Sequence, residues 1–334
     1  MSLPKVTLFT LGGTIASTST SAKSGGVVPQ LNAQEILASV PQLEVIAQIE
    51  PVAFRQVPSG DLNFSDLFAL ASAIEVAFSD GSVGVVITQG TDSIEESAFV
   101  LDLLTPGGRP IVVTGAMRNP TQVSSDGPAN LLSAVQVAIS EAAVGLGVLV
   151  VLNEEVHTAR FVRKTHTSTL GTFQSPTIGP IGWISEGRVH IPYRISKMKT
   201  IEHGPSTVVP PVAVVTCALG DDALILGEIE SLGYKGVVIE GFGGGHVPAR
   251  VVPAIEDLAS RIPVILTSRT GAGELLRQTY AFPGSEQDVL SRGAVSAGSL
   301  DGIKARILLS LILTLAPELD EAKRAFEDFV QSIL

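Results

Sequence analysis

The sequence predicts an α/β protein with two domains: a larger N-terminal domain with a mostly parallel sheet and flanking helices, and a smaller C-terminal α/β domain. Short apolar runs typical of buried strands alternate with longer segments typical of helices, which indicates βαβ units. This alternation stops over residues 155–200, which are rich in Thr, Ser, Gly, His and Pro. We therefore place the domains at 1–196 and 211–334, joined by a linker at 197–210.

The segments follow one another in a regular order. The first half begins with an apolar strand at 5–10 and continues with strand-like and helix-like segments at 34–40, 52–56, 65–78, 83–88, 94–104, 110–114, 128–143 and 147–152. The second half has segments of the same kind at 212–216, 222–232, 236–240, 253–260 and 263–267, followed by two helices. The two halves share this style but no repeated sequence.

Composition excludes several classes of function. The net charge of −11, without a basic stripe, argues against nucleic acid and anionic membranes as partners. Only 16% of residues are charged, a low share that a large subunit interface would explain. The single cysteine, Cys217, excludes internal disulfides and lies in an apolar run, which favours a buried core thiol. The histidines lack the spacing of metal-ligand pairs, so we expect no metal.

Targeting and cofactor signals are also missing from the sequence. No uncharged apolar run reaches the roughly 18 residues of a membrane-spanning helix, and the first residues do not resemble a secretory signal. We therefore expect a cytoplasmic protein. A dinucleotide-binding module would fit the α/β order, but its glycine fingerprint is absent, so we expect no cofactor.

Two predicted strands end in glycine followed by a hydroxyl side chain. The strand at 5–10 leads to Gly12-Gly13-Thr14, and the strand at 83–88 leads to Gly90-Thr91-Asp92. Glycine permits sharp turns and close approach of a ligand, and open α/β sheets bind ligands at the carboxyl ends of their strands. Thr14 is thus a candidate nucleophile, or else it only hydrogen-bonds its own turn.

The segments that follow these motifs suggest a helix start and a lid. Ser93 to Glu96 matches a capping box, which leaves Asp92 free to hold a ligand; alternatively, Asp92 itself caps the helix. Residues 17–30 are a low-complexity stretch without periodicity. Directly after Thr14, this stretch favours a lid over the substrate, with an inert surface loop as the alternative.

Five motifs, in order, resemble the bacterial-type L-asparaginase family of threonine amidohydrolases over nearly the whole chain. They are Gly12 to Ala16, Gln89 to Ser93 with Glu95-Glu96, Gly115 to Arg118, Ser125 to Leu131, and Lys164-Thr165 followed by Phe173 and Gly179-Pro180. The resemblance implies hydrolysis of the side-chain amide of L-asparagine to L-aspartate and ammonia, with a side activity on L-glutamine. It also implies a homotetramer, a dimer of dimers, in which the C-terminal domain of a neighbouring subunit completes each site.

The resemblance also implies roles for single residues. Thr14 and Thr91 are catalytic together with Asp92 and Lys164, the lysine being the candidate base for Thr91. A surface lysine would be the alternative without this context. Ser59 would bind the substrate carboxylate, Asp92 its ammonium group, and the Ala116 carbonyl the leaving amide, beside Gly90.

Two departures from the family pattern affect this site. Gly60 stands where many members have glutamine, which loosens the contact with the amino-acid part of the substrate. The stretch 25–29 lacks the tyrosine of the family's lid. Tyr280 or His246 of a neighbouring subunit could replace it, although His246 could equally be a solvated turn residue. A catalytically weak amino-acid-binding protein is therefore the alternative function.

Overall fold

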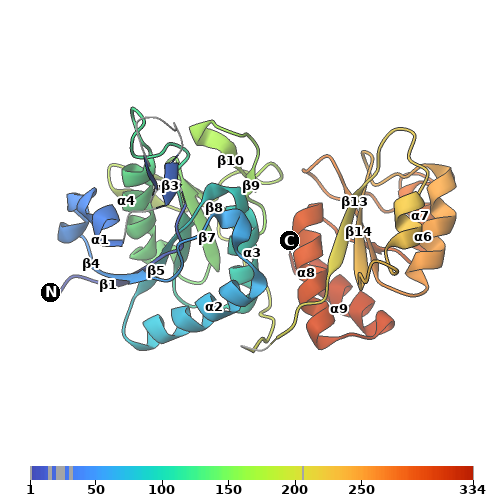
Figure 1. The fold of residues 1–334 in the computed structure, drawn as a ribbon, viewed down its shortest axis with the longest axis horizontal. Coiled ribbons are helices and arrows are strands. Elements are labelled where there is room, and N and C mark those ends of the chain that lie inside the picture. Colours follow the sequence, from blue (N-terminus) through green and yellow to red (C-terminus); the bar gives the residue numbers. More distant parts are fainter. Residues whose placement is uncertain (1, 14–16, 20–26, 30–32, 205–206, 334) are drawn as a thin grey trace. The chain divides into compact units, whose positions relative to one another are not determined.

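The computed structural model describes all residues except 1, 14–16, 20–26, 30–32, 205–206 and 334. The chain divides into two compact units, Met1–Pro205 and Ser206–Leu334, each with its own sheet and helices (Figure 1). The first unit holds a large, mostly parallel sheet and the second a smaller parallel one. The predicted fold class is confirmed.

The first unit is built on an eight-stranded sheet in the order β12-β11-β8-β7-β6-β5-β1-β4. Strands β4, β1, β5, β6 and β7 are parallel to one another, whereas β8, β11 and β12 extend the sheet in antiparallel fashion. The strands are β1 (Lys5–Thr10), β4 (Gln48–Ala53), β5 (Gly84–Thr88), β6 (Ile111–Thr114), β7 (Val148–Leu152), β8 (Glu155–Thr158), β11 (Gly182–Ser185) and β12 (Arg188–His190).

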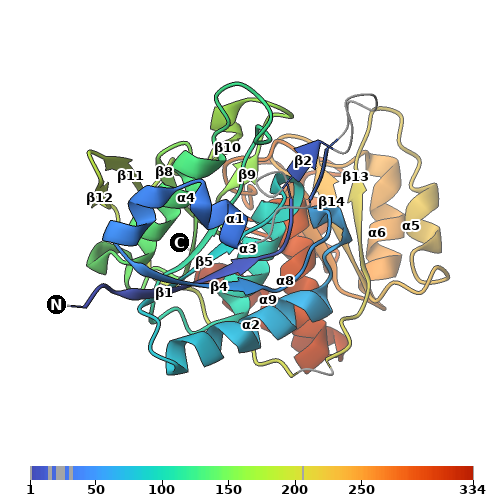
Figure 2. The ribbon, with the colours of Figure 1, turned by 60° about the vertical axis from the view of Figure 1, so that its left-hand side comes forward.

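Helices cover both faces of this sheet (Figures 1 and 2). Alternate strand residues such as Val6 and Leu8 are fully buried towards α4, while α2 and α3 pack together on the opposite face. The helices are α1 (Ala33–Ala38), α2 (Phe64–Ser79), α3 (Ile94–Leu104) and α4 (Gly127–Ala138), with short 3-10 turns η2 (Pro41–Val45), η3 (Ser59–Asp61), η4 (Thr91–Ser93), η5 (Glu141–Ala143) and η6 (Leu170–Thr172).

Two small antiparallel ribbons lie outside the main sheet. The first pairs β2 (Ser17–Ser19) with β3 (Val27–Pro29), so the predicted lid begins and ends in strands, while its middle lies outside the described residues. The second pairs β9 (Arg163–Lys164) with β10 (Phe173–Gln174). The break in the α/β order after residue 155 thus corresponds to β9 and β10 and to the antiparallel edge of the main sheet.

The second unit has a four-stranded parallel sheet in the order β13-β14-β15-β16. Helices α8 and α9 lie on one face and α5, α6 and α7 on the other (Figure 1). Cys217 is buried, as expected, and burial raises the pKa of its thiol to about 11. The elements are β13 (Val212–Thr216), α5 (Leu224–Glu228), β14 (Gly236–Gly241), η7 (Ala249–Val251), α6 (Val252–Ala259), β15 (Val264–Ser268), α7 (Glu286–Ser291), β16 (Val295–Ser296), α8 (Gly302–Leu315) and α9 (Leu319–Gln331).

Among the described residues, we find no helix with both the length and the apolar character needed to cross a membrane.

Candidate active site

The carboxyl ends of β1, β5 and β6 bring three of the sequence motifs into contact. A Cβ atom at Gly13, where φ is +86°, would lie 2.1 Å from the Gly90 nitrogen. A Cβ atom at Gly115 would lie 2.7 Å from the Gln89 carbonyl oxygen. Only glycine permits such close approach of one backbone to another. The predicted motifs therefore meet at one edge of the sheet; Thr14, next to Gly13, lies outside the described residues.

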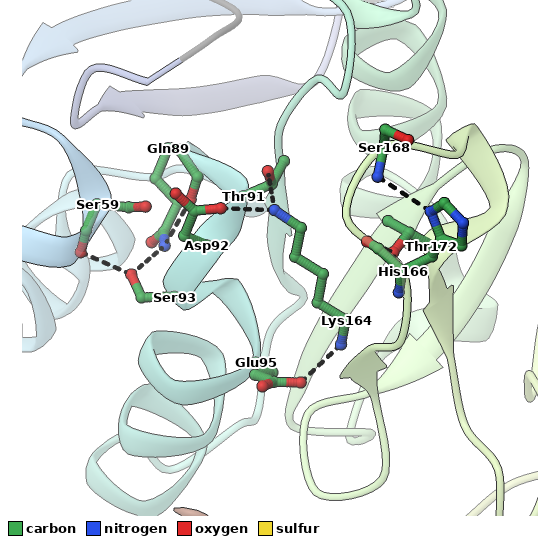
Figure 3. A network of polar contacts seen from close by, with 11 residues as sticks. Ser59, Gln89, Thr91, Asp92, Ser93, Glu95, Lys164, His166, Ser168 and Thr172 are labelled. Carbon is green, nitrogen blue, oxygen red and sulfur yellow. Dashed lines mark hydrogen bonds and ion pairs between the residues drawn. The ribbon is translucent and has the colours of Figure 1, made fainter.

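Lys164 joins the two polar side chains that follow β5. Its Nζ lies 3.0 Å from Thr91 Oγ1 and 2.6 Å from Asp92 Oδ1 (Figure 3). The Thr91 side chain is buried and that of Lys164 is 15% exposed, whereas the Asp92 carboxylate is 83% exposed. The contacts therefore tie a buried hydroxyl to an open carboxylate through one ammonium group.

The main chain of Lys164 is held by a side chain that we did not single out for this purpose. Glu95, in the first turn of α3, accepts the Lys164 backbone N–H at 2.6 Å through Oε2. In the sequence, Glu95 belongs to the predicted helix start and to the second family motif, and neither assigns it a contact with Lys164. Its contact with a residue 69 positions away leaves no local signal in the chain.

Ser59 lies in η3, next to the β5 motif. Its side chain is buried, and a Cβ atom at Gly90 would lie 2.8 Å from its Oγ. Ser93 Oγ donates to the Ser59 carbonyl oxygen at 2.8 Å, and buried Gln89 joins this network through Ser93 and Ser97. Neither residue was predicted as a site residue: Gln89 belongs to the second family motif but has no implied role there, and Ser97 belongs to none of the five motifs.

The predicted capping box at Ser93 is wrong. Helix α3 does begin at Ile94, but the Ser93 hydroxyl makes no capping hydrogen bond. Ser93 has φ −120° and ψ 17° rather than the extended conformation typical of a capping residue. Its hydroxyl instead donates a hydrogen bond to the carbonyl oxygen of Ser59, in a different segment of the chain.

Ala116 follows β6 and is fully buried. The loop around it is fixed by Asp126, whose carboxylate accepts the N–H groups of Met117 and Arg118 at 3.0 and 2.8 Å. Asn130 Nδ2 donates to the Gly115 carbonyl oxygen at 3.0 Å. Gly60, by contrast, is exposed, and a Cβ atom there would meet no atom of the described residues within 4 Å.

A cavity of about 360 Å³ opens beside the lysine. It is lined by Asp92 and by Lys164 to Thr167. His166, in this wall, accepts the N–H groups of Ser168 and Thr169 at 3.1 and 3.3 Å through Nδ1, so in the neutral ring the proton sits on Nε2. The sequence pattern did not point to His166, which has no metal-ligand partner at a regular spacing.

His246 and Tyr280 both belong to the second unit, where their rings meet edge to face with centroids 5.0 Å apart. His246 Nε2 lies 3.2 Å from Glu286 Oε2, and Glu286 is fully buried. Although burial raises the pKa of Glu286, N–H groups of Tyr280 and Thr279 and the nearby His246 lower it overall. The two predicted residues thus form one cluster with Glu286.

Within the ranges that the structure describes, no three His, Cys, Asp or Glu side chains gather so that they could hold a metal ion.

Comparisons with known proteins identify the family of this chain. Family models described as "Asparaginase, N-terminal" and "Glutaminase/Asparaginase C-terminal domain" match residues 5–197 and 211–326. A probable periplasmic L-asparaginase of Haemophilus influenzae is 34% identical over 98% of this chain and 93% of its own. An L-asparaginase of Bacillus licheniformis is 35% identical over 92% of this chain and 95% of its own.

A solved structure gives the same result. The crystal structure of a probable cytoplasmic L-asparaginase from Campylobacter jejuni superposes with a TM-score of 0.87 at 29% identity, covering 97% of this chain and 99% of that one. Sequence and fold agree over almost the full length of each relative. The chain therefore belongs to the bacterial-type asparaginase family of amidohydrolases.

Proposed function

We propose that this protein is an L-asparaginase, which hydrolyses the side-chain amide of L-asparagine to L-aspartate and ammonia, with L-glutamine as a side substrate. Relatives at 34% and 35% identity carry the name L-asparaginase. The observation that carries the proposal is the position of Lys164 Nζ between Thr91 Oγ1 and Asp92 Oδ1, at 3.0 and 2.6 Å.

The proposed reaction needs a threonine nucleophile and a base, because a hydroxyl is a weak nucleophile at neutral pH. Lys164 Nζ, in its uncharged form, accepts the Thr91 proton, and Asp92 then stabilises the ammonium. The threonine oxygen bonds to the amide carbon, the C–N bond breaks as its nitrogen takes a proton, and ammonia leaves. Water then cleaves the resulting ester, which releases the carboxylate and restores the threonine.

Two threonines are candidates for the ester. Thr91 is the one whose contact with Lys164 is described, and Thr14 is the other hydroxyl that follows a strand at this edge. We propose that one forms the ester and the other relays a proton. Cleavage of the acyl-enzyme into peptides, followed by mass spectrometry, distinguishes the two.

The substrate-binding groups are proposed from the same loops. Ser59 would bind the α-carboxylate, Asp92 the α-ammonium, and the Ala116 carbonyl the leaving amide, with Gly90 making room between them. Exposed Gly60 adds no side chain to this set, which supports a looser hold on the amino-acid part of the substrate.

The assembly is also a proposal. We infer a homotetramer, a dimer of dimers, in which Tyr280 or His246 of a second copy supplies what the lid lacks, because no tyrosine occurs between residues 17 and 30. The expected cytoplasmic location stays a prediction, since one relative is named periplasmic and another cytoplasmic.

Ammonia release by purified variants tests the proposed function. Thr14→Ala, Thr91→Ala and Lys164→Met should each lower kcat by at least about 100-fold, the scale of lost acid–base or nucleophilic catalysis. Lys199→Met, at an exposed lysine, is the control and should leave kcat unchanged. A variant that keeps more than about a tenth of kcat, a loss below ~1.4 kcal/mol in the barrier, removes that residue from the mechanism. Asparagine binding without ammonia release by the unaltered protein would instead favour the weakly catalytic binding protein.

A further inference from the structure

Lys164 lies on strand β9, which is not part of the eight-stranded main sheet. Strand β9 has two residues and, among the described strands, pairs with β10 alone, in a sheet of two strands. A lysine side chain is long and has many rotamers, so the position of Nζ depends on how firmly the main chain is fixed. Some other contact must therefore set the position of this backbone.

Glu95 provides that contact. Its Oε2 accepts the Lys164 N–H at 2.6 Å, a short hydrogen bond of the charge-assisted kind. Glu95 lies in the first turn of α3, whose neighbouring residues Ile94, Ala98 and Phe99 are all fully buried. The anchor therefore stands on a rigid element packed in the core.

The same short stretch of chain also carries both partners of the lysine side chain. Thr91 and Asp92 lie in η4, which leads directly into α3, and they contact Nζ at 3.0 and 2.6 Å. Residues 91–95 thus contact Lys164 at its backbone nitrogen and at the end of its side chain, as Figure 3 shows. Fixing both ends of the lysine from one element defines the Nζ–Oγ1 distance.

We propose that Glu95 is a positioning residue for amide hydrolysis, which sets the distance from Lys164 Nζ to Thr91 Oγ1 by anchoring the lysine main chain. This inference rests on the proposed function. In this role Glu95 is a hydrogen-bond acceptor for the Lys164 main chain and takes no part in making or breaking bonds. Its role therefore concerns kcat rather than substrate binding.

Variants at Glu95 distinguish the effect of its hydrogen-bond acceptor from the effect of its negative charge. Glu95→Leu removes the acceptor, and a misplaced base should lower kcat by about 10-fold to 100-fold, with KM changed less than about 3-fold. Glu95→Gln keeps an oxygen that accepts the Lys164 N–H and should recover most of kcat. Glu96→Leu, one residue further along the same turn, is the control and should behave like the unaltered protein, because consecutive helical side chains point in different directions.

An NMR measurement reports on the anchor without using activity. In protein labelled with ¹⁵N-lysine, the Lys164 amide proton should resonate far downfield and exchange slowly, and Lys164→Met identifies the signal by its loss. Glu95→Leu should shift this signal upfield and speed its exchange, whereas Glu95→Gln and Glu96→Leu should retain it.

The outcomes decide the inference clearly. An unchanged Lys164 signal in Glu95→Leu, or kcat within about 2-fold of the unaltered value, overturns it. Failure of Glu95→Gln to recover kcat also overturns it, since the charge rather than the position would then matter. If the unaltered protein releases no ammonia, the proposed function fails, while the amide signal still decides whether Glu95 anchors Lys164.

Discussion

Acid should destabilise the first unit through one buried imidazole, that of His157 on β8. The ring is fully buried, with Nδ1 2.9 Å from Ser175 Oγ and Nε2 3.4 Å from Glu155 Oε2. Burial lowers the pKa of His157 from 6.5 to about 4. The folded protein therefore keeps the ring neutral at pH values where the unfolded chain protonates it.

The size and sign of the effect follow from linkage. Above pH 6.5 the ring is neutral in both states and contributes nothing to the pH dependence. As pH falls from 6.5 to 4, the unfolded state binds a proton that the folded state does not bind, so stability falls with pH. With a pKa lowered from 6.5 to about 4, the total loss of unfolding free energy is about 3 kcal/mol.

Urea unfolding at several pH values measures this effect, with the single tryptophan, Trp183, as the probe. Trp183 lies on β11 and pairs with Glu155 of β8, so its fluorescence reports on the same strands. His157→Asn keeps a polar atom near Ser175 but removes the titrating ring. Between pH 7 and pH 4, the free energy of unfolding should fall in both proteins. The fall should be about 3 kcal/mol smaller in His157→Asn than in the unaltered protein.

The difference in unfolding free energy between His157→Asn and the unaltered protein at pH 7.5 serves as the reference. At this pH it contains only the pH-independent cost of changing the packing. Two free-energy curves that stay parallel from pH 7.5 to pH 4 would refute the reasoning. So would an NMR titration in which the His157 ring proton signals change around pH 6.5 in the folded protein.

Two further predictions concern the glycine contact and the assembly. Gly13→Ala should abolish activity and lower Tm, because its Cβ would lie 2.1 Å from the Gly90 nitrogen. The matched Gly81→Ala, at φ +93° with no described atom within 4 Å of its Cβ, should cost only about 1 kcal/mol of backbone strain and keep kcat. Retained activity in Gly13→Ala would contradict the close contact of the two motifs. Tyr280→Phe should lower kcat, measured by ammonia release, and sedimentation should show a tetramer. Full activity of Tyr280→Phe would remove Tyr280 from the mechanism, and a fully active monomer would remove the second copy.

The parallel strands and their junctions could be predicted from the sequence because they carry local signals. An apolar run that ends in glycine, as at Gly90, marks a strand that stops at the edge of a sheet. The alternation of strands and helices gives the fold class by the same kind of signal. The structure confirms the fold class, and it brings Thr91, Asp92 and Lys164 together as the family resemblance implied.

Contacts between distant segments could not be predicted in this way. Ser93 has the residue type of a helix cap, but its hydroxyl donates to the carbonyl oxygen of Ser59, 34 positions away. Glu95 looks like an ordinary acidic residue of a first helical turn, yet its carboxylate binds the Lys164 backbone. Neither partner follows from periodicity, since a single hydrogen bond across the fold leaves no repeating pattern in the sequence.

The position of Lys164 depends on contacts at two places along the ribbon that carries it. Glu95 binds its backbone beside Thr91, and the His157–Ser175 contact joins β8 to the residue that directly follows β10. The first contact needs a carboxylate or amide oxygen, and the second is formed with an imidazole that burial keeps neutral. Loss of either contact leaves this ribbon of two short strands with only one of the two contacts. We therefore expect the geometry of the proposed base to depend on Glu95 and His157, neither of which is proposed to bind the substrate.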